Sequence, residues 1–581
     1  MSAASKFVRS YFPFVVVGGT FAWSVFAIYG HRAVEAPPGT ITLRIAHWQL
    51  ETGVRDAFNE LADEYAKLHP NVRIVQDAIP ETTYGQWVST QLMGGTAPDM
   101  IEIGYLPPHI LVSYYNRYYL TLTRYVDQPN PYNAGTEFEG VPLRLTYKDG
   151  MRTGYVEELQ EYMNIPLSQF GVRLFYNKDL LKKLTGLDEA PSEYRAFLDV
   201  CEQIASQQNE LGEYYTPIAG SKFHFAMWES YMFNPFTYGA VRKADFNRDG
   251  YVGYDENYVA FSTGRLTFES PWIANKFRMV REITDYFQSG YTGLTRDEAV
   301  FLFAQQRAVF ITTGTWDALS LADQARGRFE VGLLSFPNPT PDDPVYGEQM
   351  EGPLYEYPMQ GFAFGITRSC DHPEVALDFL LFLASRHGNE RMNRIIGWIP
   401  AIRNAEMAPL IAEFTPNIYG MYNAINFNMG GETWIKWLQM YALYQVKQIT
   451  YEEFAAEFGP FYLERGIEDF RELQKDWRRG IARNEQFLAG VRAKALMADG
   501  DEALSHWVKY RALTASRQIW PEVWHNAQVK MMERGPDLDA TGPYEYSDEV
   551  LERVRQRLRR EDRQARAAPA ESGRPRGTAG G

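Results

Sequence analysis

The spacing of hydrophobic positions from residue 41 onward predicts short strands that alternate with helices. Residues 41–46 alternate between apolar and polar, as in a half-buried strand. Residues 54–68 carry apolar side chains three and four positions apart, which is typical of one face of a helix. By the same criteria residues 72–75 and 100–103 predict two further strands, and residues 82–93 predict a helix between them.

This order of strands and helices predicts a parallel sheet, because parallel strands need a crossover connection that is usually a helix. Ligands of such sheets bind beyond the carboxyl ends of the strands. His47 and Trp48 follow the first predicted strand, and Glu102 and Tyr105 lie at the end of the third. These side chains are therefore candidates for a ligand site.

A different pattern occupies the N-terminus, where residues 11–30 are almost entirely apolar. Twenty helical residues span about 30 Å, the hydrocarbon thickness of a bilayer. Lys6 and Arg9 precede the run, which places the N-terminus in the cytoplasm and the rest of the chain outside. We expect residues 1–32 to form a cytoplasmic stub and membrane anchor, with a cleaved signal peptide as the alternative. Residues 33–40 are then a linker.

Composition narrows the classes of function. The net charge of −15 argues against nucleic acid as a partner, since binding phosphates requires a basic surface. Aromatic residues make up 15% of the chain, so some are available for a binding site as well as for cores. Only Cys201 and Cys370 are present, which excludes a disulfide framework and a cysteine-rich metal centre. One bridge or two buried thiols remain open.

Residues 245–256 match the calcium-loop pattern D-x-[DN]-x-[DN]-G-x5-E at every position. The pattern places oxygen ligands around a Ca²⁺ ion, and it allows a sharp turn at a glycine. The flanking residues are not clearly helical, so we expect a lone structural loop rather than a paired EF-hand. The predicted ligands are Asp245, Asn247 and Asp249 through side-chain oxygens, Tyr251 through its carbonyl, and Glu256 as a bidentate clamp.

The C-terminal part of the chain has a helical pattern followed by a short tail. Residues 455–535 are rich in Leu, Ala, Arg, Glu and Trp at helical spacing, and we expect residues 456–567 to form a helical extension. Residues 568–581 have the composition of a disordered tail.

Motifs for catalysis are largely absent from the sequence. There is no G-x-x-x-x-G-K-[ST] nucleotide loop, no G-x-S-x-G elbow and no H-E-x-x-H zinc pair. The nine histidines are scattered without metal-ligand spacing. A pair of glycosidase carboxylates has no sequence motif, so a carbohydrate-active enzyme remains an alternative.

Several short motifs together resemble one family, the extracellular solute-binding proteins of family 1, which are the sugar and maltodextrin receptors of ABC importers. The motifs occur in the family's order between residues 41 and 405. They are Leu43-Arg-Ile-Ala-His-Trp48, Gly95-Thr-Ala-Pro-Asp-Met100, Arg173-Leu-Phe-Tyr-Asn177, the segment 303–316 ending in Gly314-Thr-Trp316, Gly361-Phe-Ala-Phe-Gly-Ile366 and Gly397-Trp-Ile-Pro400. The usual Pro-Thr-Trp helix start is Pro191-Ser-Glu-Tyr here, which departs from the family pattern.

The resemblance implies an α/β, two-lobed periplasmic-binding-protein fold of the type II kind. It implies that each lobe is built from separate segments of the chain. We assign residues 41–155 and 298–345 to lobe one and residues 156–297 and 346–455 to lobe two, with an insertion at about 232–262.

The resemblance also implies the function. We expect an extracytoplasmic receptor, not an enzyme, that closes by a hinge on a carbohydrate, above all an oligosaccharide, and delivers it to the membrane subunits of an ABC importer. It would be held at the inner membrane by one N-terminal helix, or secreted after cleavage. A membrane-tethered sensor or scaffold is a further alternative. The candidate ligand-binding residues are Trp48, Glu102, Tyr105, Asn177 and Trp316, with Trp228 and Trp398 as secondary candidates; core packing competes with binding for each aromatic residue.

Overall fold

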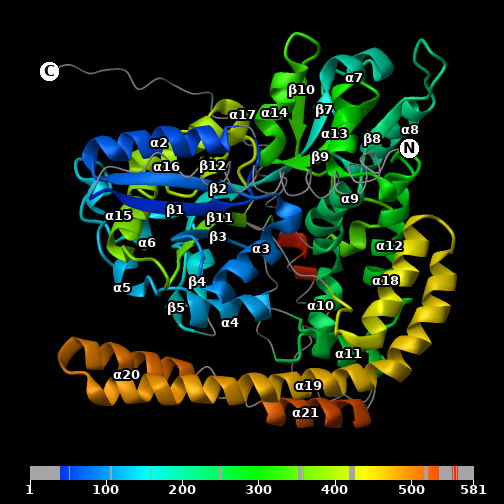
Figure 1. The fold of residues 1–581 in the computed structure, drawn as a ribbon. Helices are drawn as coiled ribbons and strands as arrows, with labels where there is room; N and C mark the ends of the chain where they lie inside the picture. The colour runs from blue at the N-terminus through cyan, green and yellow to red at the C-terminus, as the bar shows by residue number, and fades with distance from the viewer. Residues whose placement is uncertain are drawn as a thin grey trace, which may run out of the picture.

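Two lobes lie side by side, and a long helical segment passes beneath both of them in the view of Figure 1. The computed structural model describes residues 39–51, 53–104, 108–156, 159–247, 252–350, 356, 359–417, 425–515, 521–534, 552–553, 555–557 and 559–560. The predicted membrane anchor 11–30 and the tail 568–581 lie outside the described residues. None of the helices in the described ranges combines the length and the apolar character needed to cross a bilayer.

The predicted alternation of strands and helices is confirmed in the first lobe. Strand β1 (Ile41–His47) pairs in parallel with both β2 (Val72–Ala78) and β3 (Met100–Ile103). Helix α2 (Val54–Leu68) connects β1 to β2, and α3 (Glu81–Gly94) connects β2 to β3. The helical spacing predicted these crossovers because it gives α2 one continuous buried face.

Strands from later in the sequence complete this sheet. Its order is β12-β6-β11-β3-β1-β2, and β11 (Met359–Ile366) runs antiparallel to both β3 and β6 (Ile165–Phe170). The other elements of the first lobe are α4 (Pro108–Tyr118), α5 (Thr123–Val126), α6 (Leu143–Thr146), the hairpin of β4 (Tyr155–Val156) and β5 (Glu161–Tyr162), α15 (Pro373–Leu383), α16 (Arg386–Ile396) and β12 (Ile399–Pro400).

The second lobe has its own four-stranded sheet in the order β10-β7-β9-β8. Strand β7 (Val172–Asn177) lies antiparallel between β9 (Ala308–Gly314) and β10 (Val331–Leu334), and β8 (Thr216–Ala219) is parallel to β9. Its helices are α7 (Lys178–Thr185), α8 (Tyr194–Ala205), α9 (Lys222–Trp228), α10 (Tyr238–Ala244), α11 (Tyr254–Ser262), α12 (Pro271–Thr284), α13 (Arg296–Ala304), α14 (Thr315–Ala325), α17 (Pro409–Ala412) and α18 (Gly431–Gln445).

This topology corrects the predicted division into lobes. Residues 298–345 were expected in lobe one, yet their strands β9 and β10 pair with β7 of the second lobe. The segment that follows was expected in lobe two, yet β11 and β12 join the first sheet. Strand pairing between segments far apart in sequence decided this division, and the local patterns carry no record of such pairing.

The predicted insertion, about 232–262, is helical on both sides of the calcium-loop sequence. Helix α10 ends at Ala244 and α11 begins at Tyr254. The expectation of non-helical flanks is therefore wrong. Both helices are short and are stabilised by burial in the second lobe's core rather than by a long amphipathic pattern, which is why the spacing did not indicate them.

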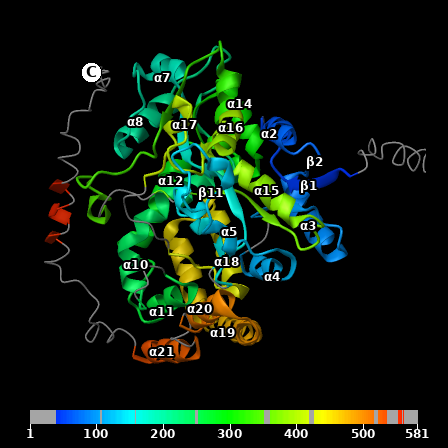
Figure 2. The ribbon, with the colours of Figure 1, turned by 90° about the vertical axis from the view of Figure 1, so that its left-hand side faces the viewer.

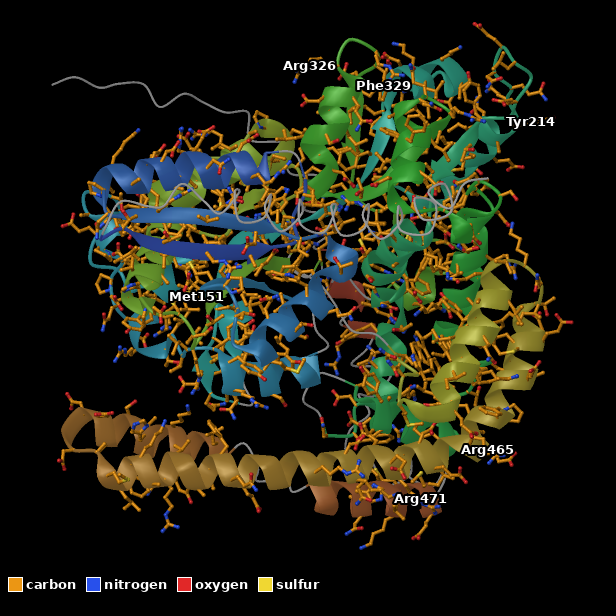
Figure 3. All side chains as sticks on the ribbon, in the orientation of Figure 1. Met151, Tyr214, Arg326, Phe329, Arg465 and Arg471 are labelled. Atoms are coloured by element: carbon orange, nitrogen blue, oxygen red, sulfur yellow. The ribbon has the colours of Figure 1, made fainter. Side chains whose placement is uncertain are left out.

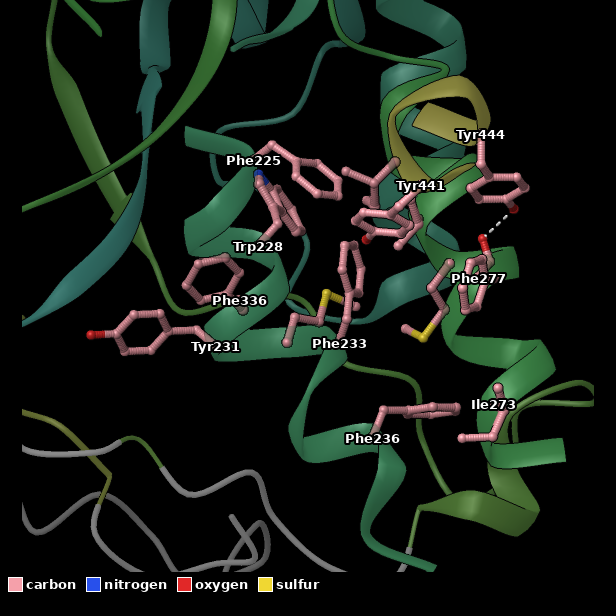
Figure 4. Close-up of a cluster of buried hydrophobic side chains, with 14 of the residues drawn as sticks. Phe225, Trp228, Tyr231, Phe233, Phe236, Ile273, Phe277, Phe336, Tyr441 and Tyr444 are labelled. Atoms are coloured by element: carbon pink, nitrogen blue, oxygen red, sulfur yellow. Dashed lines mark hydrogen bonds between the residues drawn. The ribbon is translucent and has the colours of Figure 1, made fainter. Parts of the chain in front are cut away.

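That core also settles the position of one candidate ligand residue. Trp228 lies fully buried at the end of α9, where it packs edge-on against Phe336 and stacks on Phe233 (Figure 4). Across the same cluster, the Tyr444 hydroxyl donates a hydrogen bond to the carbonyl of Phe277 at 2.6 Å (Figure 4). Trp228 is thus a core residue.

Three helices follow α18 in the C-terminal part: α19 (Tyr451–Met497), α20 (Gly500–Ala515) and α21 (Pro521–Arg534). Helix α19 begins against the second lobe and runs across to the first, where α20 folds back on it (Figure 1). In the perpendicular view α19, α20 and α21 lie together at one end of the molecule (Figure 2). Cys201 and Cys370 are both free and buried.

The chain passes from the first lobe to the second at Gly171, between β6 and β7. A Cβ atom at this position would lie 2.2 Å from the carbonyl oxygen of Phe414, so only glycine allows the two backbones to approach.

Next to this crossing, Arg173 forms a buried network between segments. Its guanidinium donates to both carboxylate oxygens of Glu356 at 3.0 and 3.1 Å, to the carbonyl of Glu413 at 2.9 Å and to that of Thr415 at 2.8 Å. Glu356 accepts a further bond from the Asn417 amide at 2.8 Å. One side chain therefore joins three segments at the junction of the lobes.

We expect Arg173→Met to lower the free energy of unfolding by about 3 kcal/mol, because it leaves Glu356 as a buried charge without its partner. Urea denaturation of both proteins measures this difference. Arg326→Met is the matched control, since Arg326 projects from the tip of the second lobe into solvent (Figure 3). The control should change stability by less than about 0.5 kcal/mol. Equal effects of the two substitutions would contradict a structural role for the network.

Candidate functional site

The loop after β1 is held in place by Glu102 at the end of β3. The carboxylate of Glu102 accepts the backbone N–H of Trp48 at 3.1 Å and the side-chain amide of Gln49 at 2.5 Å. The Trp48 ring lies edge-on to Tyr84, with centroids 5.0 Å apart. It also lies against Gly104, whose φ of +124° and missing side chain leave room for the ring.

Glu102 itself is fully buried. Burial raises its pKa well above the usual range, and the bonds from Gln49 and Trp48 oppose that rise. Because both carboxylate oxygens are already engaged by this loop, Glu102 acts on the site by orienting Trp48.

An ionic contact connects the same loop to the second lobe. Glu51 Oε1 lies 3.5 Å from Nη1 of Arg296, the first residue of α13. Arg296 in turn bonds Asp317 in the first turn of α14 at 2.5 Å, and Thr313 donates to that carboxylate at 2.5 Å. The three charged side chains therefore form a chain from one lobe to the other.

Glu51 retains an unused acceptor at this position. Burial raises its pKa, and the nearby charge of Arg296 opposes the rise. Its second carboxylate oxygen, Oε2, is buried and accepts no hydrogen bond from any of the described residues. A buried oxygen without a partner is costly, so this atom marks a place where a ligand hydroxyl or a water would be stabilised.

Trp316 lies where the two lobes meet. It follows Gly314 at the start of α14, and its ring packs edge-on against Phe170 of the first lobe and Phe223 of the second, at 5.9 and 6.0 Å. It contacts the apolar cores of both lobes. Its indole Nε1 is buried, and in the described part of the chain no acceptor is within hydrogen-bond distance.

His224 on α9 is the third junction residue with a buried polar atom that lacks a partner in the part of the chain that the structure describes. Its Nδ1 lies 2.8 Å from the hydroxyl of Ser221, while Nε2 is buried and has no partner among the residues described. Burial, aided by the charge of Arg296, lowers its pKa to about 3, so the ring is neutral at physiological pH. Phe223, its neighbour, lies under the Arg296 guanidinium at 5.4 Å.

These contacts bring together segments that are far apart in sequence. The loop after β1, the start of α9, the start of α13 and the start of α14 meet at the lobe junction. They present aromatic rings beside unpaired donors and acceptors from both lobes. Such a site suits a neutral polar ligand that has an apolar face and several hydroxyl groups.

The other predicted site residues lie elsewhere. Asn177 ends β7 as the N-cap of α7, accepting the Leu180 amide at 2.9 Å, and it lies at the opposite end of β7 from Gly171. Trp398 is buried in the first lobe's core between Phe170 and Phe362. Tyr105 lies outside the described residues.

Sequence reasoning missed Glu51, His224 and Arg296. Glu51 follows Trp48 by three positions, so the strand-end argument that selected Trp48 extends naturally to it. No local pattern identifies His224 or Arg296, because their relation to the site arises from the packing of α9 and α13 beside α14.

Part of the calcium-loop sequence is also described. Glu256 points back into the loop, where its carboxylate accepts the amides of Phe246 and Asn247 at 3.0 and 3.1 Å and that of Gly253 at 3.1 Å. Asp245 is the C-cap of α10, whereas Asp249 and Tyr251 lie outside the described residues. Within the described ranges, no three His, Cys, Asp or Glu side chains are grouped as a metal site.

The structure has two α/β lobes that meet at a junction of aromatic rings and unpaired polar atoms, which is the architecture of a two-lobed solute-binding fold. Comparison with known families agrees: residues 51–390 match the family of bacterial extracellular solute-binding proteins, and the chain belongs to this family.

Related proteins show how far the similarity extends. An ABC transporter extracellular-binding protein of Pyrococcus horikoshii is 22% identical over 380 residues, covering 63% of this chain and 73% of that protein. A multiple sugar-binding protein of Streptococcus mutans is 22% identical over 287 residues, 48% of this chain and 58% of that protein. Among solved structures, a chitin oligosaccharide binding protein has a TM-score of 0.51 at 18% identity, covering 75% of this chain and 100% of that one.

The low pKa of His224 predicts a pH dependence of stability. The unfolded chain takes up a proton on this histidine below about pH 6.5, whereas the folded protein does not until about pH 3. Stability is therefore lost as the pH falls through that window. Between pH 7 and pH 5, we expect the wild type to lose about 2 kcal/mol more than His224→Gln, measured by urea denaturation.

His372→Gln, at a half-exposed histidine, is the control and should leave the pH dependence unchanged. A parallel loss in wild type and His224→Gln would show that His224 is not buried as described.

Proposed function

We propose that this protein is an extracytoplasmic receptor that captures a carbohydrate, above all an oligosaccharide, and presents it to the membrane subunits of an ABC importer. The observation that carries the proposal is that Trp316 and Phe223 lie at the lobe junction with the unpaired polar atoms of Glu51 and His224, while Trp48 lies on the same loop as Glu51. Aromatic faces pack on the C–H surfaces of sugars, while carboxylate and imidazole groups bind hydroxyls.

The atoms available at the junction match the hydrogen-bonding needs of a sugar. Glu51 Oε2 supplies an acceptor, the Trp316 indole supplies a donor, and the neutral His224 supplies either at Nε2 according to its tautomer. Each sugar hydroxyl is both donor and acceptor, so one ligand would satisfy all three. Hinge movement at Gly171 would then bring both lobes against the ligand.

Relatives support the class of ligand. The similar protein of Streptococcus mutans is a multiple sugar-binding protein, and proteins of the same fold have been solved as a chitin oligosaccharide binding protein and in complex with raffinose. Location outside the cytoplasm agrees with membership of an extracellular family. The apolar run 11–30 supports attachment to the membrane from the sequence alone.

We propose binding without turnover, and we keep two other functions as outcomes of the experiment. Thermal melts of the purified chain are recorded against a panel of mono- and oligosaccharides, with chromatography of each sugar afterwards. A sugar at a hundred times its Kd adds roughly 2.7 kcal/mol and raises the Tm. Shortened sugars would indicate a carbohydrate-active enzyme. No shift with any sugar would favour a membrane-tethered sensor or scaffold.

Substitutions then test the site itself. We expect Trp48→Ala and Trp316→Ala each to weaken binding of the identified sugar about tenfold or more, because each removes about 1.5 kcal/mol of aromatic contact. Isothermal titration calorimetry measures the Kd. Tyr214→Ala is the control, since this aromatic side chain projects into solvent from the second lobe, far from the junction (Figure 3). Affinity within twofold for both tryptophan variants would rule out this site.

A second proposal concerns residues 245–256, which we propose bind a structural Ca²⁺ ion. The full match to the calcium-loop pattern supports it, and so does Glu256, whose carboxylate already faces the loop as the last ligand would. Burial raises the pKa of Glu256 to about 8, so a cation beside it would favour the ionised form. Asp245, Asn247, Asp249 and Tyr251 would supply the other oxygens. The ion would stiffen the turn between α10 and α11.

Calorimetric titration of the chain with CaCl₂ tests this second proposal. We expect saturable uptake of one ion, and we expect Glu256→Gln to weaken it at least about tenfold, because removal of a charged ligand costs more than about 1.4 kcal/mol. Glu210→Gln, at an exposed glutamate of the second lobe, should leave uptake unchanged. No uptake at millimolar calcium, or equal uptake by Glu256→Gln, would remove the proposal.

A further inference from the structure

Helices α19 and α20, residues 451–515, form a segment that we call the strap because it touches both lobes. It departs from the second lobe, crosses beneath the gap between the ribbons and reaches the first lobe in Figure 1. Helix α19 has 47 residues and one interior proline, Pro460, which lacks a backbone N–H and lies in the part that packs on the second lobe. The part after Pro460, which crosses to the first lobe, is a stiff connector because its turns are held by backbone hydrogen bonds.

The strap is firmly attached to the second lobe. Phe454, Phe458, Tyr462 and Phe470 of α19 are all within 1% of complete burial in that lobe's core. Tyr462 packs edge-on against Phe261 at 5.8 Å and against Phe427 at 5.3 Å. Four large aromatic side chains at this interface make separation of α19 from the second lobe very costly.

Polar contacts reinforce this attachment. Asp469 of α19 accepts the backbone amide of Thr433 at 2.9 Å and its hydroxyl at 2.6 Å, at the start of α18. Helix α21 packs behind α19, where Gln528 donates to Asp255 at 2.5 Å and His525 stacks on Phe470 at 4.7 Å. The second-lobe end of the strap therefore behaves as part of that lobe.

Contact with the first lobe is much lighter. Phe487 of α19 packs against an apolar cluster that includes Tyr84 and Tyr115, the same cluster on which Trp48 packs. Lys509 of α20 forms an ion pair with Glu161 of the β4–β5 hairpin, and its ammonium lies 5.2 Å from the ring centroid of Phe487. Opening of the lobes would have to break the contacts of these two strap side chains.

Glu161 remains anchored without the strap. Its other carboxylate oxygen accepts the hydroxyls of Thr121, at 2.7 Å, and Thr123. Loss of Lys509 would therefore leave the β4–β5 hairpin in place. The light contact is thus separable from the fold of the first lobe.

We propose that the strap limits how far the two lobes open, with a permanent attachment to the second lobe and a releasable contact on the first. The chain crosses between the lobes at Gly171, again between β10 and β11, and again after β12. Strands β9 and β12, which pair with β7 and β6 on either side of Gly171, lie on the side of the molecule opposite the strap (Figure 1). Opening about Gly171 would draw Glu161 and Tyr84 away from the strap, so Phe487 and Lys509 must separate from them first.

This role of the strap rests on the proposed function, because both require hinge movement of the lobes. The test of the strap needs no ligand, so the strap proposal and the proposed sugar binding can fail separately. Spin labels are placed at Ser113→Cys on α4 of the first lobe and Glu269→Cys between α11 and α12 of the second, both exposed positions. The native cysteines are buried and stay in place. Double electron–electron resonance on the full chain in mild detergent gives the distribution of distances between the lobes.

We expect Phe487→Ser/Lys509→Met to lengthen the mean distance and to broaden the distribution. Lys509→Met alone, which keeps the apolar stem over Phe487, should give a smaller change in the same direction. Lys494→Met is the matched control, because Lys494 is an exposed lysine on α19. It should reproduce the wild-type distribution.

Circular dichroism and thermal melts check that each variant is folded, and Lys509→Met carries the test if the double variant is not. An unchanged distribution in a folded strap variant would overturn the proposal. A shorter mean distance would overturn it as well, because the strap would then hold the lobes apart rather than limit their opening.

Discussion

The arrangement of this molecule depends on the junction at which two lobes, each with its own sheet, are joined. Gly171 allows the backbone to pass within contact distance of the Phe414 carbonyl, and Arg173 ties the adjoining segments together through Glu356 and two carbonyls. Trp316 touches the apolar cores on both sides. Because each lobe has its own sheet, we expect the lobes to keep their shapes when their relative position changes.

The ligand site follows from the same arrangement. Loops that leave sheets of different lobes converge where the lobes meet. Glu51 Oε2 and His224 Nε2 are buried there and lack a partner among the described residues. In a single closed core such atoms would be costly defects, whereas between movable lobes they are groups that a ligand can satisfy.

The helical segment after residue 450 adds a constraint that the two lobes alone do not have. Its aromatic side chains extend the second lobe's core, and its far end reaches the first lobe through Phe487 and Lys509. The difference between these two attachments is a difference in burial. Four nearly fully buried rings hold one end, and one partly buried ring with an ion pair holds the other.

Local patterns in the sequence determined the elements: the first three strands and two helices follow from hydrophobic spacing, and the order of the short motifs indicated the family. Those patterns also selected Trp48 and Trp316, because strand ends and a Gly-x-Trp turn are local features. Tertiary structure alone decided which sheet β9 to β12 join, since pairing depends on distant partners. It also decided that Trp228 and Trp398 are core residues, that Asn177 is a helix cap, and that Glu51, His224 and Arg296 meet. A residue's burial and its neighbours are properties of the packed chain, and spacing along the sequence does not encode them.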